Sequence, residues 1–250
     1  MNLYIIALLE AFIQDKLSAF SLLNIVKSAV YLCDLKQLAL KLGGLSDFYL
    51  NFWKVLGFLP PESFKKNIFG PFDLQVIIEP AVARAIEKVT QAKIIIGEAI
   101  PVHLHYTDEK FIHLVAGLVR FEKDDEGYLF LVDLSIAKDD IKGIPHNSSY
   151  VIDFVKSYDE SQRMPLRELV RLKGLNYNQF QKDCKICFGD TFYSFLLKLK
   201  MLEAASDIIY TAMSLKEIAF KNKFPDYGNM YKTFVRYGIN PTQIPRLANL

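Results

Sequence analysis

The chain is poor in cysteine, histidine and tryptophan, and its basic and acidic residues nearly balance. It has three cysteines, four histidines and one tryptophan among 250 residues, with 30 basic against 28 acidic side chains. So few cysteines, in odd number, do not form a disulfide framework and fit a reducing cytoplasm. Cys184 and Cys187 form a single Cys-x-x-Cys pair, which cannot fill a zinc site, so we favour core packing over a redox switch.

Patterns that mark enzymes, secreted proteins and disordered chains are missing as well. There is no phosphate-binding glycine loop and no nucleophile in a recognisable elbow, which favours a binding protein over an enzyme. The apolar N-terminus carries Glu10, Asp15 and Lys16 and has no basic flank before it, which argues against a signal peptide and a membrane anchor. A hydrophobic content of 51% is enough for two domain cores and argues against disorder.

Residues 1–19 instead predict an amphipathic helix. Its apolar side chains allow two alternatives, a seam between the subunits of a homodimer or packing onto the protein's own sheet. The side chains concerned are Leu3, Ile6, Leu9 and Phe12.

The following part of the chain, residues 20–145, predicts a mixture of strands and helices. A short apolar helix is followed by a strand at 29–35 and, after a polar turn, by a second strand that ends at Gly43-Gly44. A short amphipathic helix then stops at Gly57, and a longer helix follows Pro80. The remainder of this part predicts a meander of three strands separated by polar turns.

This order of elements, with these residues, resembles a PAS sensor domain over residues 22–142. The resemblance rests on AVYLCDL as the first strand, LNFWKVLGFLPPESF as a helix and FEKDDEGYLFLVDLSIAKDDIK as the last hairpin. It implies either a dimerisation unit or a site for a small molecule, haem or flavin. The reactive-cysteine motif of flavin photosensors is absent and no histidine falls in the middle helices. The cofactor is therefore unknown, with a small-molecule ligand in the PAS-like domain as the candidate.

The histidines allow an alternative for the sensor. Gly97, His103, His105 and Glu109 nearly reproduce the spacing of the first metal-binding signature of cupins, and imidazoles two apart on a strand point the same way. Residues 71–92 fit a helix where a cupin needs strands, and a second matching signature is missing. We assign no metal ligand and keep a cupin-like metal or sugar sensor as the alternative.

Two helix-turn-helix patterns occupy the C-terminal part of the chain. They cover residues 166–189 and 214–241, and an unbroken helical pattern over residues 192–210 joins them. A tandem pair of such units commonly reads duplex DNA, with the second helix of each unit in a major groove.

In the first unit, Gly174 supplies the turn and Asn176 caps the second helix, in which Phe180 and Cys184 face inward. The outer positions carry amides and lysines, which can contact base edges and phosphates.

In the second unit, Ser214 and Glu217 predict a capping box, and Met230 and Phe234 face inward in the second helix. The candidate DNA-contacting residues of both units are Asn176, Tyr177, Asn178, Gln179, Lys182, Lys185, Asp226, Tyr227, Asn229, Lys232 and Arg236.

Residues 163–246 resemble the tandem helix-turn-helix domain of the AraC/XylS family of bacterial transcription regulators. The matching marks are Lys185 and Gly189, the linker FLLKLKMLEAASDII, the opening SLKEIA, and the closing Gly238, Pro241 and Arg246. The resemblance implies a regulator that binds double-stranded DNA. We expect it to be a homodimer, with RNA polymerase as a further candidate partner.

The second unit departs from the family pattern in more places than the first. Lys223 stands where the family has glycine, Lys200 replaces an arginine, and one residue is missing between Phe234 and Gly238. In the first unit, Cys184 replaces a core phenylalanine. The departures keep open another alternative, a partner-binding adaptor whose helix-turn-helix units have degenerated.

Charge divides along the same line as the motifs. Residues 163–250 hold 14 Lys and Arg against 7 Asp and Glu, whereas residues 1–162 hold 16 against 21. A basic domain suits a polyanion such as DNA. The predicted fold class is therefore α+β. The predicted parts are an amphipathic helix at 1–19, a PAS-like α/β sensor domain at 20–145, a linker at 146–162 and an all-α tandem helix-turn-helix DNA-binding domain at 163–250.

These observations predict a sequence-specific transcription regulator in the cytoplasm, without a membrane partner. Its sensor domain is expected to control either dimerisation or DNA binding.

Overall fold

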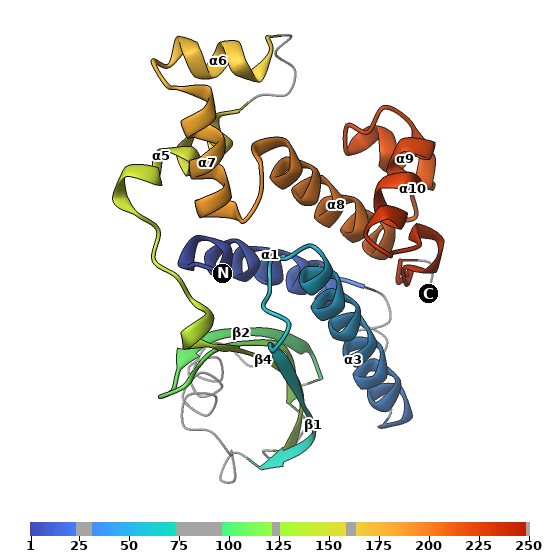
Figure 1. The fold of residues 1–250 in the computed structure, drawn as a ribbon. Coiled ribbons are helices and arrows are strands. Elements are labelled where there is room, and N and C mark those ends of the chain that lie inside the picture. The colour runs from blue at the N-terminus through green and yellow to red at the C-terminus, as the bar shows by residue number, and fades with distance from the viewer. Residues whose placement is uncertain (24–31, 74–96, 122–125, 159–163, 249–250) are drawn as a thin grey trace.

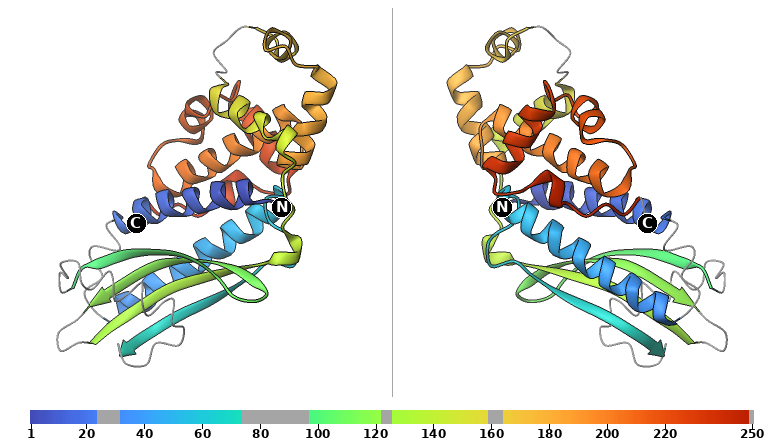
Figure 2. Two further views of the ribbon diagram at one scale, coloured as in Figure 1. Left: turned by 90° about the vertical axis from the view of Figure 1, so that its left-hand side faces the viewer. Right: turned by 90° about the vertical axis from the view of Figure 1, so that its right-hand side faces the viewer.

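The computed structural model describes residues 1–23, 32–73, 97–121, 126–158 and 164–248. A β-sheet lies at one end of the molecule and the helix-turn-helix units lie at the other (Figure 1). Helix α1 (Leu3–Ser21) lies between them, and helix α3 (Leu32–Val55) lies beside it, in both views of Figure 2. The fold is thus mixed α/β with an antiparallel sheet and a helical C-terminal part.

The sheet has four antiparallel strands in the order β1-β4-β3-β2. The last three strands confirm the predicted meander, whereas β1 is a strand that the sequence-based prediction lacks. Gly70 and Pro71 interrupt its pattern, and such residues are tolerated at a sheet edge, where β1 lies: among the described strands it pairs with β4 alone. The strands are β1 (Phe64–Asp73), β2 (Ala99–Thr107), β3 (Phe111–Phe121) and β4 (Glu126–Ala137).

Helix α3 corrects the sequence-based expectation for residues 32–44. The strand predicted at 29–35 and the second strand ending at Gly43-Gly44 are wrong, because residues 32–55 form one helix; residues 29–31 lie outside the described residues. The buried side chains Leu35, Leu38 and Leu42 recur every three or four residues, which is a helical period. The same helical period continues through Gly43 and Gly44, where the sequence predicts the end of a strand.

The PAS resemblance loses its first strand through this correction. The end of the helix is confirmed, because Gly57 adopts a left-handed φ of 73° directly after α3 and the chain then turns toward β1. The helix predicted after Pro80 lies outside the described residues. What remains of the resemblance is this helix end and the hairpin of β3 and β4.

Helix α1 begins at the buried Asn2, whose side-chain oxygen accepts a hydrogen bond from the amide of Ile5. Ile6, Leu9 and Phe12 are buried within the chain, whereas Leu3 is 64% exposed. The helix packs on β2 and β3 on one side and on α8 on the other. Three of the four candidate dimer-seam residues therefore pack inside the protein.

The C-terminal half is helical, and residues 146–158, within the expected linker, contain a short helix that packs on α7. None of the described helices is both long and apolar enough to cross a membrane. The elements are η1 (Lys138–Asp140), η2 (His146–Ser148), α5 (Tyr150–Ser157), α6 (Leu166–Leu172), α7 (Tyr177–Phe188), α8 (Phe192–Tyr210), α9 (Leu215–Lys221), α10 (Tyr227–Arg236) and η3 (Pro241–Gln243).

One hydrophobic core extends from the sheet through α1 and α3 into the helix-turn-helix units. Aromatic pairs cross the boundary between the two halves. The ring centroids of Phe52 and Phe234 are 6.0 Å apart, and those of Phe58 and Phe195 are 6.1 Å apart. A smaller apolar cluster, which includes Val115 of β3, lies on the opposite face of the sheet.

Candidate nucleic-acid interface

The turns of the two helix-turn-helix units share one backbone geometry. Gly174 has a φ of 71° after α6, and Lys223 has a φ of 56° after α9. In each unit the residue after this position donates its amide to a carbonyl five residues earlier, from Leu175 to Val170 and from Phe224 to Ala219. The left-handed region favours glycine, so the departure at Lys223 keeps the turn at the cost of backbone strain.

Asn176 is the N-cap of α7, as predicted. Its side-chain oxygen accepts hydrogen bonds from the amides of Asn178 and Gln179, at 2.9 and 3.1 Å. Phe180 and Cys184 are fully buried in the same helix, which confirms their inward direction. The cap at the start of α7 and the packing of its inner face on the core together set the direction of its outer face.

Both helix cysteines are packing residues. Cys184 and Cys187 are each 0% exposed, and the Cys187 thiol donates to the carbonyl of Ser148 at 3.2 Å. Burial raises the pKa of the Cys184 thiol to about 12 and that of Cys187 to about 11. Thiols with raised pKa values form little thiolate, so neither suits a redox switch.

The candidate residues of α7 divide into two groups. Asn178, Lys182 and Lys185 are exposed side chains on the outer face. Gln179 is exposed but donates to Asp183 at 3.0 Å. Tyr177 is half-buried, accepts a hydrogen bond from Gln181 and lies under the Arg167 guanidinium.

Asp183 is a residue of this unit that sequence reasoning missed. It is a buried carboxylate and accepts hydrogen bonds from the hydroxyls of Ser148 and Tyr150, at 3.0 and 2.8 Å. These two bonds attach η2 and α5 to α7, and the bond from Gln179 within α7 holds the Asp183 carboxylate in place. The only sign of this role in the sequence is that an acidic residue occupies an inward-facing position of α7, where its neighbours are apolar.

Helix α9 has the capping box that the sequence predicts between Ser214 and Glu217. Its far end is tied to α8, because the buried Asp207 accepts hydrogen bonds from Lys221 and Asn222, at 2.6 and 2.7 Å. These contacts place α9 firmly against the linker helix.

Helix α10 begins with a cap that involves two predicted DNA-contacting residues. The Asp226 carboxylate accepts hydrogen bonds from the backbone and the side-chain amide of Asn229, both at 2.7 Å. The bond from the Asn229 backbone, first among several, lowers the pKa of Asp226. Asp226 and Asn229 thus stabilise the helix start.

The remaining candidates of α10 lie further along the helix. Lys232 and Arg236 are exposed, whereas Tyr227 is half-buried and packs against Tyr231. Met230 and Phe234 are fully buried, as predicted.

Helix α8 joins the two units over the residues predicted for it, 192–210. Two of its lysines bind residues in the turns that precede and follow the neighbouring helices. The buried Lys198 pairs with Asp190 at 2.6 Å, and Lys200, which replaces a family arginine, donates to the carbonyl of Lys223 at 3.4 Å. At the close of the domain, Arg246 donates to the carbonyl of Met213 at 3.0 Å.

The histidines of the sheet form two separate groups. His105 pairs with Glu10 of α1 at 3.4 Å, and the neighbouring His103 has a pKa lowered first by burial. Among the described residues, no group of three or more histidine, cysteine or acidic side chains is arranged to hold a metal ion.

The second group is centred on His113. One ring nitrogen lies 2.9 Å from Asp133 and the other lies 3.0 Å from Asp108, while Tyr106 stacks on the ring at 4.5 Å. Burial lowers the pKa of His113, but the hydrogen bonds to Asp133 and Asp108 outweigh it, and the net result is a raised pKa.

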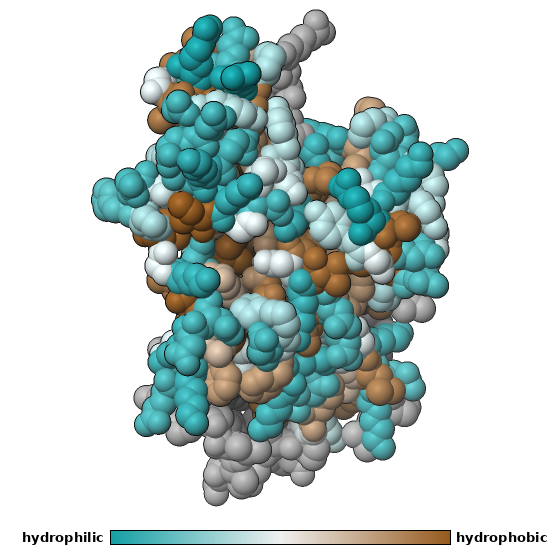
Figure 3. Space-filling view, in the orientation of Figure 1, coloured by the Kyte–Doolittle hydropathy of each residue, from teal (hydrophilic) through white to brown (hydrophobic). Residues whose placement is uncertain are grey.

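On the face shown in Figure 3, hydrophilic side chains gather over the lobe that α6 and α7 form. Apolar residues are concentrated nearer the middle of the molecule. Among the apolar residues, Phe220 of α9 has a highly exposed side chain, at 85%.

Comparison with known proteins identifies the class of the C-terminal part. Residues 169–246 match a family model described as a helix-turn-helix domain. The class is that of DNA-binding domains, and within it the match is to the AraC type found in transcription regulators. The matched residues make up less than a third of the chain.

A solved structure is also similar to this chain. It is the C-terminal domain of the two-component response regulator yesN from Fusobacterium nucleatum, with 22% sequence identity and a TM-score of 0.34. The match covers 40% of this chain and 98% of that one. No curated protein matches the chain.

Proposed function

We propose that this protein is a sequence-specific, DNA-binding transcription regulator whose N-terminal α/β part senses a signal. The observation that carries the proposal is the tandem pair of capped second helices, α7 and α10, inside a region of AraC type. Each of these helices has a buried face and an outer face with exposed cations. This combination suits one helix in a major groove and the other in the next.

Within the outer faces, we assign different roles to different residues. Lys182, Lys185, Lys232 and Arg236 are the phosphate contacts, because they are exposed cations. Asn178 is the base reader of α7, since an exposed amide can pair with an adenine edge. Asn176, Gln179, Asp226 and Asn229 act first by holding the helix starts, and Tyr177 and Tyr227 by packing beside them.

The assignment is tested by selecting duplexes from a random library with the full chain and then measuring a salt series. Selection should enrich a motif with two half-sites about one helical turn apart. Lys182→Ala should weaken binding to all sequences and reduce the salt slope by about one. Asn178→Ala should relax preference at one base pair.

Lys110→Ala is the matched control, because Lys110 is an exposed lysine in the turn between β2 and β3, at the sheet end of the molecule. Its salt slope should equal that of the wild type. Binding without enrichment would contradict base reading. Binding that does not depend on salt would favour the adaptor alternative.

The sensor role is the second element of the proposal. It draws support from the contact of α1 with both the sheet and the linker helix α8, because a change in the sheet part can reach α8 through a single helix. We include a homodimer in the proposal, with surfaces other than Ile6, Leu9 and Phe12, since those side chains are buried. Light scattering of the purified chain, with and without DNA, tests that state.

A further inference from the structure

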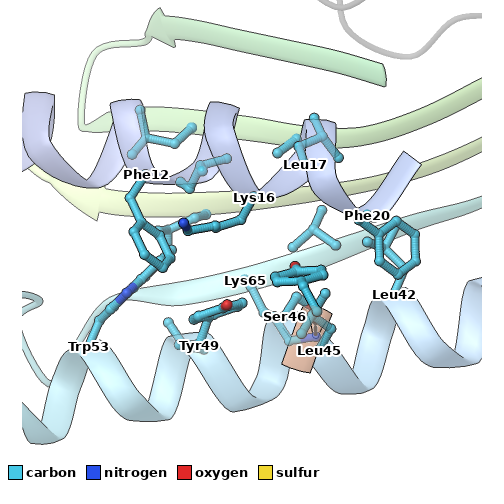
Figure 4. A pocket seen from close by; sticks show the side chains of 17 residues that line it. Phe12, Lys16, Leu17, Phe20, Leu42, Leu45, Ser46, Tyr49, Trp53 and Lys65 are labelled. Carbon is cyan, nitrogen blue, oxygen red and sulfur yellow. Dashed lines mark hydrogen bonds between the residues drawn. The ribbon is translucent and has the colours of Figure 1, made fainter. Parts of the chain in front are cut away.

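A cavity of about 100 Å³ lies between α1, α3 and the strands β3 and β4. Its walls are mainly aromatic and aliphatic. Phe12 comes from α1, Leu45, Tyr49 and Trp53 come from α3, and Ala116 comes from β3. Figure 4 shows side chains of α1 and α3 extending toward one another across this space.

Trp53 has a feature that packing alone does not explain. The residue is 5% exposed, and among the described residues its indole Nε1 has no hydrogen-bond partner. Buried N–H groups are nearly always paired, and the indole N–H can only donate. Trp53 also lines the cavity, so a molecule there can supply the missing acceptor.

The two lysines of the cavity are already neutralised. Lys16 pairs with Asp15 at 2.6 Å and with Glu203 at 3.2 Å, and Lys65 pairs with Asp47 at 3.0 Å. A carboxylate ligand would have to compete with these side chains for the ammonium groups. The cavity therefore favours a neutral ligand.

We propose that this cavity binds a small, neutral, largely apolar molecule with one hydrogen-bond acceptor, which the Trp53 indole engages. Its volume of about 100 Å³ is smaller than the apolar cavity of about 150 Å³ that holds benzene, so it suits a ring or chain of at most about six non-hydrogen atoms. Tyr210 at the end of α8 lines the same cavity, and Lys16 links it to Glu203 of α8. An occupant would thus contact the linker of the DNA-binding units, and its use as a signal rests on the proposed function.

The single tryptophan makes the site directly observable, because tryptophan fluorescence of the full chain reports on Trp53 alone. Three probes with the same number of non-hydrogen atoms separate the requirements: tetrahydropyran has an acceptor, cyclohexane has none, and butyrate is a charged carboxylate. We expect a saturable emission change with tetrahydropyran, an affinity roughly fivefold weaker for cyclohexane, and no binding of the carboxylate. Equal affinity for the two neutral rings, tightest binding of the carboxylate, or no saturation with any probe would overturn the proposal.

Two variants test the location. Ala116→Leu should fill the cavity and abolish binding, whereas Ala137→Leu, at the end of β4 and outside the lining, should leave it unchanged. If Ala116→Leu does not fold, Trp53→Phe serves instead, with binding followed by ligand-observed NMR. It should remove the preference for tetrahydropyran over cyclohexane, and a preference that persists would contradict the role of the indole.

Binding is measured without DNA, so its outcome does not depend on whether the chain binds DNA. The regulatory step is tested afterwards by comparing DNA affinity with and without saturating tetrahydropyran.

Discussion

Lys223 illustrates how a single backbone angle limits a helix-turn-helix unit. Its φ of 56° is in the region where a side chain is strained, and the turn keeps its hydrogen bonds nevertheless. Lys223→Gly should therefore raise the free energy of unfolding by about 1 kcal/mol, measured by chemical denaturation. Lys216→Gly is the matched control, because Lys216 lies inside α9 and glycine there should destabilise. If Lys223→Gly instead lowered the free energy of unfolding, backbone strain at this position would not be the dominant effect.

His113 gives the folded protein a pH dependence at the level of one side chain. Because its pKa is raised in the folded state, protonation stabilises the protein. That contribution is complete below the unfolded pKa of about 6.5 and is lost as the pH rises through the raised folded value. The carboxylate of Asp108 has a pKa lowered to about 2, first by the Phe111 backbone, so it stays charged throughout this window.

We expect the stability difference between the wild type and His113→Gln to be larger near about pH 6 than near about pH 9. Urea denaturation at the two pH values measures it. If the stability difference between the wild type and His113→Gln grew with pH, protonation of His113 would not stabilise the folded protein.

At the scale of elements, local patterns predicted the C-terminal half better than the N-terminal half. Caps such as Asn176 and Ser214 and the turn at Gly174 each follow from residues within a few positions, so α6 to α10 were found. Helix α3 was missed because the glycines at 43 and 44 imitate a strand end. Only packing shows that Leu35 and Leu42 face the same core.

Contacts between distant elements had no signal in the sequence. The side chain of Asn2 donates to the carbonyl of Cys187 at 2.7 Å, across 185 residues of chain. Neither residue type nor spacing predicts such a pair. The position of Asp183 under α5 was missed for the same reason.

Asn2 therefore caps α1 and also joins it to α7, and substitutions can separate these two effects. Asn2→Ala should lower the free energy of unfolding by about 1 to 2 kcal/mol, since it removes the cap and the partner of a buried carbonyl. Asn2→Ser should cost less, because a serine hydroxyl still caps α1 but is shorter. Thermal or urea denaturation distinguishes them, and equal losses would mean that the cap contributes nothing.

At the scale of the whole molecule, the continuous core predicts that the described halves unfold together. Trp53 reports on the N-terminal half, whereas far-ultraviolet circular dichroism reports largely on the helices of both. The two signals should give coincident urea transitions. Phe52→Ala should shift both equally, because Phe52 stacks on Phe234 of α10. Two separate midpoints would show that the halves are independent.

The shared core also limits how the two halves of this chain can be separated. In the intact chain, Phe195 and Phe234 are covered by Phe58 and Phe52 from the other half. A chimera that grafts residues 163–250 onto a foreign receptor would remove these contacts from both rings. Such a transplant should retain α1 and α3 with the donor segment if it is to remain soluble.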